Sequence, residues 1–159
     1  MQTIKTFLWF DGNGEEAVDF YVSVFKDAKK GRVQYYGDSF PDAKLRGKVL
    51  TATMTFRGQE FVALNAGPNF KFTPAISFMV TCETQQEIDA YWAKLTDGGS
   101  TMACGWLTDK FGLTWQITPD ALNTMLADPD KAKAARVMEA MMGMVKLDIA
   151  VLERARDGE

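Results

Sequence analysis

The stretch ISFMVTCETQQEIDAYWAKLTDGGSTMACGWLTDKFGLTW, from Ile76 to Trp115, decides the fold. It opens with the apolar run Ile76 to Val80, which predicts a strand. Gln85 to Leu95 follows, with apolar residues at the spacing of an amphipathic helix. Gly98-Gly99 then breaks the chain, and strand-like residues continue to Trp115. The stretch therefore predicts one strand, one helix and a further group of strands.

A weaker copy of this stretch lies seventy positions earlier in the chain. Phe7 to Phe10 falls near the first strand, and Glu15 to Phe25 falls on the helix. The helical positions match in pairs, namely Val18 with Ile88, Asp19 with Asp89, Tyr21 with Tyr91, and Phe25 with Leu95. A repeat of this length is one supersecondary unit used twice.

Each copy reads as strand, helix and three more strands, which predicts an α+β fold of paired βαβββ modules. The modules would cover residues 1–67 and 68–118 within a single domain, 1–118. Two such sheets, each with one face covered by a helix, would form a curved, open half-barrel. Its concave face would be the ligand site, because concavity removes a small molecule from water. Residues 119–159 have helical patterns and are predicted to form a C-terminal helical extension.

Composition excludes several classes of function. The 159-residue chain has a net charge of −3 and no basic stripe, which argues against a nucleic-acid partner. No apolar run approaches the length of a membrane span, so we expect no membrane partner and a cytoplasmic location. Cys82 and Cys104 are expected to be reduced there. The absence of histidine excludes serine triads, Cys–His pairs and histidine-based zinc sites.

Several motifs resemble one known family. The double βαβββ plan is similar to that of the vicinal oxygen chelate (glyoxalase/bleomycin-resistance/dioxygenase) superfamily. Within it, the chain resembles the PhnB-like branch, which is often labelled 3-demethylubiquinone-9 3-methyltransferase. The resemblance covers nearly the whole chain, including the helical tail, and implies a homodimer. The matching motifs are Leu8–Gly12, Glu16–Tyr21, Leu64–Pro68, Phe70–Phe72, Cys104–Leu107 and Asp109–Gln116.

The resemblance also implies where a metal ion would bind. Classical members hold a divalent metal with four side chains, and the matching positions here are Thr6, Ala63, Ile76 and Gln116. Only Gln116 is a usual ligand, and a weak one, so the cup is predicted to be metal-free and to need no cofactor. This departure puts lyase, isomerase and ring-cleaving dioxygenase chemistry in doubt.

A methyltransferase usually holds S-adenosylmethionine over a glycine-rich turn after its first strand. The turn Phe10 to Glu15 has two of those glycines and lacks the third, and no parallel βαβ series follows it. The turn is therefore interpreted as the start of a helix, with Asn13 or Asp11 as a possible cap.

Candidate ligand-contacting residues follow from strand alternation. If Thr6 and Gln116 face the cup, every second residue of the same strands faces it too. Such a lining is apolar with a few amides and hydroxyls, and it suits a flat or aromatic small molecule better than a phosphate or polyanion. These candidates are Leu8, Phe10, Phe61, Asn65, Phe78, Val80, Thr114 and Gln116.

Two further candidates come from the Cys-Gly-Trp motif. Cys104 is either a pocket thiol or a buried structural thiol, and Trp106 either packs in the core or contacts a ligand. Trp9 and Trp115 are expected to pack between helix and sheet.

Three functions remain open at this point. The chain could be a metal-free small-molecule-binding protein or an enzyme of the family's chemistry. It could also be a scaffold whose methionine-rich tail, including Met138, Met141, Met142 and Met144, docks a partner.

Overall fold

The computed structural model describes residues 4–159 and has two compact units. The first unit ends at Lys71 and the second runs from Phe72 to Glu159. No helix in the described part of the chain is long and apolar enough to cross a membrane.

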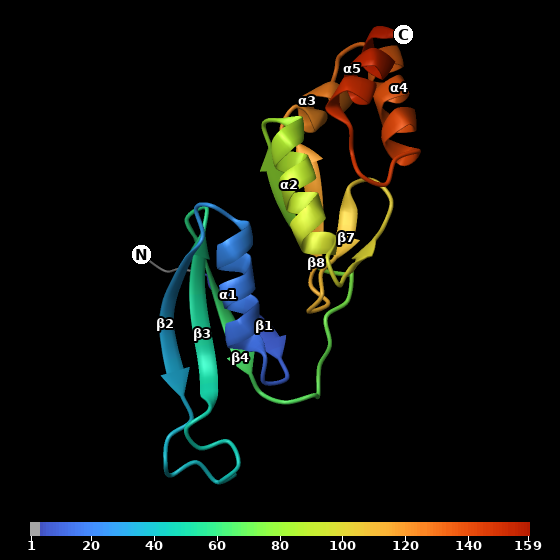
Figure 1. Ribbon diagram of the computed structural model, residues 1–159. Coiled ribbons are helices and arrows are strands. Elements are labelled where there is room, and N and C mark those ends of the chain that lie inside the picture. The colour runs from blue at the N-terminus through green and yellow to red at the C-terminus, as the bar shows by residue number, and fades with distance from the viewer. Residues whose placement is uncertain (1–3) are drawn as a thin grey trace. The chain divides into compact units, whose positions relative to one another are not determined.

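The first unit is a four-stranded sheet with one helix against one face (Figure 1). The strand order is β1-β4-β3-β2, and β1 runs parallel to β4 while the other neighbours are antiparallel. Its elements are β1 (Thr6–Phe10), α1 (Gly14–Val24), β2 (Lys29–Tyr35), β3 (Val49–Phe56) and β4 (Gln59–Asn65).

The second unit repeats this plan and adds three helices. Its strand order is β5-β8-β7-β6, with β5 parallel to β8, so the two modules have the same topology. The predicted α+β class and the βαβββ repeat are confirmed. The elements are β5 (Phe78–Cys82), α2 (Gln85–Thr96), β6 (Ser100–Thr101), β7 (Trp106–Thr108), β8 (Thr114–Pro119), α3 (Leu122–Leu126), α4 (Lys131–Met142) and α5 (Ile149–Asp157).

The helix-covered face of the first sheet is set by close packing at both ends of α1. A Cβ added to Gly14 would lie 2.8 Å from Asn65 Oδ1 and 3.1 Å from Ala63 Cβ, so the helix starts directly on β4. After the last turn of α1, the Phe25 ring stacks on Phe56 with centroids 4.3 Å apart. Glycine and a small alanine therefore allow the helix to approach the sheet closely.

The opposite face of the first sheet carries no helix of this unit. Strand pairing places Phe7 beside Val62 and Trp9 beside Leu64 on this uncovered face, with Thr53 opposite Val62. Trp9 therefore does not pack between helix and sheet, and the expectation from the sequence is wrong for this residue. Its indole Nε1 donates to the Gly67 carbonyl at 2.8 Å.

In the second unit, α2 packs on β8, β7 and β5. The fully buried apolar side chains Leu107, Trp115 and Ile117 lie on one sheet face, and Trp115 is buried as expected. Its indole Nε1 donates to the Asp109 carboxylate at 2.8 Å. Asp109 also accepts the backbone N–H groups of Phe111 and Leu113, so one buried carboxylate organises the β7–β8 hairpin.

The three C-terminal helices share a small core and are tied to the second module. Gln85 of α2 donates to the Leu147 carbonyl at 3.2 Å and accepts the Ile149 N–H at 2.9 Å. The backbone N–H groups of Cys104 and Gly105 bond to the segment between α4 and α5. The helices were predicted as an appended extension, and in the structure they form part of the second compact unit. The buried core residues are Leu122, Met125, Val137, Leu147 and Leu152.

Candidate functional site

The structure places most of the first module's predicted pocket residues beneath α1. Leu8, Phe10 and Phe61 are 5%, 3% and 4% exposed and lie on the helix-covered face of the sheet. The face predicted for them is therefore wrong. Side chains alternate along a strand, so placing Thr6 on the concave side exchanged every residue with its neighbour.

Asn65 has a structural role in this position. Its Oδ1 accepts the N–H of Gly14 at 2.8 Å, and its Nδ2 donates to the Val49 carbonyl at 3.0 Å. The N-cap residue Asn13 makes no side-chain bond to the helix. Asn65 thus takes over, from β4, the capping role that was expected of Asn13 or Asp11.

In the second module, the predicted residues divide between the two faces. Phe78 pairs with Trp115 in the sheet, and their rings lie 5.7 Å apart, so Phe78 belongs to the α2 side together with Val80. The face predicted for Phe78 is wrong. Trp106 and Gln116 are direct register partners and share the other face.

This face is the one opposite α2, and Thr114 also lies on it, two residues before Gln116 on β8. Thr114 itself is fully buried. Gln116 Nε2 donates to Ser77 Oγ at 2.8 Å. The hydroxyls of Thr114 and Thr118 are buried and have no hydrogen-bond partner within residues 4–159. A buried hydroxyl without a partner is unusual, because its desolvation is not compensated.

Cys104 contacts the helical tail rather than either sheet face. Its Sγ lies 3.7 Å from Met142 Sδ, and its backbone N–H donates to the Met144 carbonyl at 2.8 Å. The thiol is half-buried. Cys104 is therefore a residue that contacts the helical tail.

The four positions matched to the classical metal site do not form a divalent-metal site. Thr6 and Ala63 lie on the helix-covered face of the first sheet, and the Thr6 hydroxyl accepts from Gln59 at 3.1 Å. Ala63 and Ile76 have no donor atoms in their side chains. Across residues 4–159, no three His, Cys, Asp or Glu side chains are grouped so that they could hold a metal ion. The residues present therefore do not fit the metal that the fold suggests.

Sequence reasoning missed a depression on the uncovered face of the first sheet. Its volume is about 570 Å³. Its floor is formed by β3 and β4, and β1 and β2 supply its sides. The lining residues are Lys5, Phe7, Gly31, Arg32, Gln34, Thr51, Thr53, Glu60 and Val62.

A signal for this face was present in β3. The strand alternates Thr51, Thr53 and Thr55 with Ala52, Met54 and Phe56, so its apolar face must be the one beneath the helix. Pairing of Met54 with Phe61 then puts Phe61 under α1 and its neighbours on the uncovered side.

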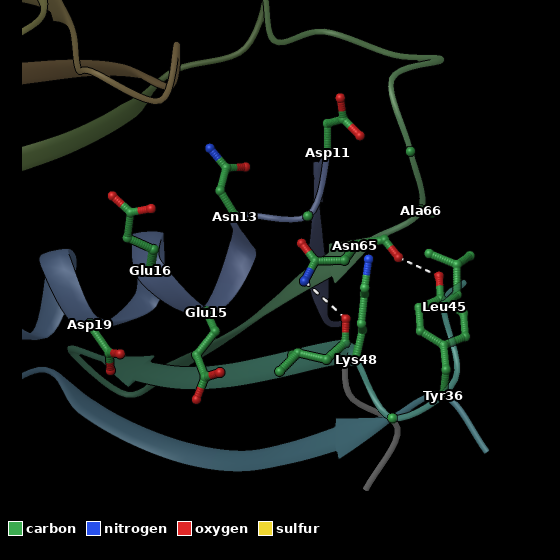
Figure 2. A pocket seen from close by; sticks show the side chains of 14 residues that line it. Asp11, Asn13, Glu15, Glu16, Asp19, Tyr36, Leu45, Lys48, Asn65 and Ala66 are labelled. Carbon is green, nitrogen blue, oxygen red and sulfur yellow. Dashed lines mark hydrogen bonds between the residues drawn. The ribbon is translucent and has the colours of Figure 1, made fainter. Parts of the chain in front are cut away.

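A second hollow, of about 850 Å³, lies at the start of α1 (Figure 2). Asn65 lines it, together with Tyr36, whose hydroxyl donates to the Asn65 carbonyl at 2.5 Å. Four carboxylates and one lysine also line it, which differs from the apolar lining expected of the site. The charged lining residues are Asp11, Glu15, Glu16, Asp19 and Lys48.

Lys30 already binds two of these carboxylates. Its Nζ lies 2.8 Å from Asp19 Oδ1 and 2.7 Å from Glu15 Oε1. These hydrogen bonds, that to Asp19 first, raise the pKa of Lys30 above its ordinary value. Two of the five charged groups that line this hollow, Glu15 and Asp19, are thus already paired within the fold.

Comparison with known proteins identifies the family. A family model described as 3-demethylubiquinone-9 3-methyltransferase matches residues 2–118. The chain belongs to this family. Because the match ends at Thr118, the family resemblance does not extend over the helical tail, contrary to expectation. No curated protein matches the chain.

Solved structures support the family and the fold. The PhnB protein of Bacillus cereus is 40% identical, with a TM-score of 0.66, and the match covers 74% of this chain and 99% of that one. A Pseudomonas aeruginosa protein matches with 21% identity, a TM-score of 0.64 and coverage of 75% and 98%. The fosfomycin resistance protein FosX of Mesorhizobium loti shares the fold at 11% identity, with a TM-score of 0.55 and coverage of 79% and 97%. These matches show that the chain has the glyoxalase fold.

Proposed function

We propose that this protein binds a small organic molecule on the uncovered faces of its sheets, without a metal ion. The observation that carries the proposal is the depression of about 570 Å³ on the first sheet. Small-molecule sites have volumes of roughly 300–1,000 Å³ and combine apolar walls with a few placed polar groups. Phe7 and Val62 supply the apolar part here, and Gln34 and Thr51 supply polar groups.

The second sheet supports the same proposal through different residues. Trp106 offers a flat apolar surface with a donor at one end, and Gln116 adds an amide on the same face. The Thr114 hydroxyl next to them is buried without a partner in the described chain. A hydrogen bond to a ligand would compensate for this, after a small local movement. Trp106, Thr114 and Gln116 are therefore kept as ligand-contacting residues, whereas Cys104 is not.

A neutral fluorescent probe tests binding at the first sheet. We expect N-phenyl-1-naphthylamine to bind the depression on the first sheet and to gain fluorescence. The Phe7→Ala variant should weaken binding about fivefold, because the probe loses apolar contact. Phe7 is 59% exposed, so its removal should leave the fold intact.

Tyr35→Ala is the matched control. Tyr35 is another strand aromatic, is also 59% exposed, and does not line the depression. Equal loss of binding in both variants, or no binding of the probe to the native protein, would contradict the proposal.

The family description makes methyl transfer the competing function. That function requires S-adenosylmethionine, so calorimetric titration with this cofactor discriminates the two. We expect no heat of binding at micromolar concentrations. Saturable binding near one equivalent would instead favour the methyltransferase.

We also propose that two chains associate. Met138, Met142 and Val145 are 45%, 62% and 50% exposed and supply apolar surface around the end of α4. Native mass spectrometry of protein purified from cells reports the number of copies and any retained small molecule together. A monomer that carries a ligand would contradict the proposed dimer but not the proposed ligand binding.

A further inference from the structure

The charges in the depression on the first sheet do not balance. Lys5 Nζ lies 2.6 Å from Glu60 Oε1, so these two opposite charges neutralise each other. Arg32 is the other charged residue of the lining, and its guanidinium makes no ion pair or hydrogen bond with any group in residues 4–159. The depression therefore has one uncompensated positive charge.

A β-bulge places Arg32 in this position. Lys30 pairs with Met54 and Val33 pairs with Ala52, so two residues of β2, Gly31 and Arg32, stand opposite Thr53 alone. The Thr53 hydroxyl donates to the Arg32 carbonyl at 3.2 Å. A Cβ on Gly31 would lie 2.4 Å from that hydroxyl oxygen, so glycine leaves the room that this bond needs. Bulges change the direction of the side chains that they carry.

The side chain of Gln34, also on β2, keeps an N–H donor that the fold does not use. The Thr51 hydroxyl donates to Gln34 Oε1 at 3.1 Å, which leaves the Gln34 Nε2 group without a partner among the described residues. Arg32 and Gln34 thus offer N–H donors on the β2 side of the depression, and the exposed ring of Phe7 lies on the opposite side, on β1. Donors without acceptors suit a group rich in oxygen lone pairs.

We propose that the ligand of this site is a small organic anion and that Arg32 binds its carboxylate, sulfonate or phosphonate group. The apolar part of the ligand lies against Phe7 and Val62. A planar guanidinium can bind two oxygens of such a group at once. This inference rests on the proposed small-molecule site and narrows its ligand class. It also adds a charged group to the apolar or aromatic ligand that the sequence favoured.

Two probes with the same aromatic body separate the charge from the apolar contact. 8-Anilinonaphthalene-1-sulfonate carries a sulfonate, and N-phenyl-1-naphthylamine lacks it. We expect the sulfonate to bind the native protein about tenfold more tightly, as charge-assisted hydrogen bonds predict. Its affinity should fall as salt is added, because the site is open to solvent.

Arg32→Gln should weaken sulfonate binding about tenfold and leave the neutral probe within about twofold. Arg32→Lys should retain part of the preference, since it keeps the charge without the planar fork. Glu60→Gln should strengthen sulfonate binding, because it releases Lys5 from its ion pair. Lys44→Gln removes an exposed charge outside the depression and is the matched control.

The outcomes separate this inference from the proposed function. If neither probe binds the native protein, the proposed site itself is refuted. If the neutral probe binds but the sulfonate is not favoured, the site stands and the anion is refuted. Equal weakening of both probes by Arg32→Gln would also refute it, because the arginine would then only maintain the shape of the site. A loss in Lys44→Gln as large as in Arg32→Gln would assign the effect to general surface charge and refute it as well.

Discussion

The threonines on the two uncovered faces have opposite hydrogen-bond states. In the first sheet, Thr51 and Thr53 donate to Gln34 and to the Arg32 carbonyl. In the second sheet, the buried hydroxyls of Thr114 and Thr118 have no partner within residues 4–159. The two sheets have the same strand order, so topology does not determine the chemistry of a face. The threonines of the first face hold Gln34 and the backbone of Arg32 in place, whereas the hydroxyls of the second face are buried without such a role.

The N-terminal ends of α1 and α2 are also capped differently. Helix α1 depends on Asn65, which is far away in the sequence, to accept the Gly14 N–H. Helix α2 has a local cap, because the Thr84 side chain accepts the Glu87 N–H at 3.2 Å and Glu87 bonds back to the Glu83 N–H at 2.9 Å. This is similar to a capping box, except that Glu87 bonds to the N–H of the residue before the cap and not to that of Thr84 itself. One module therefore relies on a tertiary contact where the other uses a local signal.

Asn65→Ala should have the largest effect on stability. Asn65 is 6% exposed, and its loss leaves the Gly14 N–H and the Val49 carbonyl without their partner. We expect the free energy of unfolding to fall by about 3 kcal/mol, the sum of two buried bonds. Urea denaturation followed by circular dichroism measures it. A smaller loss of unfolding free energy than that caused by Thr84→Ala would contradict the view that α1 depends on Asn65 more than α2 depends on its local cap.

Thr84→Ala tests the other side of that contrast. Loss of a side-chain cap lowers the free energy of unfolding by about 1 kcal/mol. The same urea titration applies, and Thr84→Ser should restore most of the loss because it retains the hydroxyl acceptor. No difference between alanine and serine would show that the hydroxyl does not cap α2.

Thr114→Val should be stabilising. It replaces a buried hydroxyl that lacks a protein partner with a methyl group of similar shape, which should raise the free energy of unfolding by up to about 1 kcal/mol. Thr53→Val, in contrast, removes a bonded hydroxyl and should be neutral or destabilising. Melting temperatures of the two variants check the sign. Destabilisation by Thr114→Val would indicate that this hydroxyl has a partner after all, against the difference drawn between the faces.

The smallest effect is expected where the tail meets α2. Lys146 Nζ lies 2.5 Å from Asp89 Oδ1, and this hydrogen bond, with a second from Gln85, lowers the pKa of Asp89 below its ordinary 3.8. A carboxyl with a lowered pKa stabilises the folded state above its unfolded pKa and loses this contribution as pH falls through the folded value. Lys146→Gln should therefore melt slightly below the native protein at pH 7. The difference should disappear in melts recorded well below pH 3.8. A difference that persists there would assign the effect to packing.

Part of the site could have been predicted from the sequence. The alternation in β3 separates threonines from apolar residues, and the apolar set must face a helix. The prediction instead followed the metal positions of the family from Thr6, and this reversed the faces of β1 and β4. Gln116, Trp106 and Thr114 kept a common face because β7 and β8 are antiparallel neighbours whose register the hairpin sets. Phe78 was misplaced because the register of a parallel strand depends on no local turn.

The sequence alone determined the duplication, the α+β class and the helical nature of the C-terminal residues, because periodicity and turn residues are local properties. Only the tertiary structure decided that Asn65 caps α1, that Lys5 is neutralised by Glu60, and that a bulge directs Arg32 into a depression. Each of these depends on which residues, distant along the chain, become neighbours across strands. A shift of one residue in pairing moves every side chain to the other face, and no local pattern in a single strand records that choice.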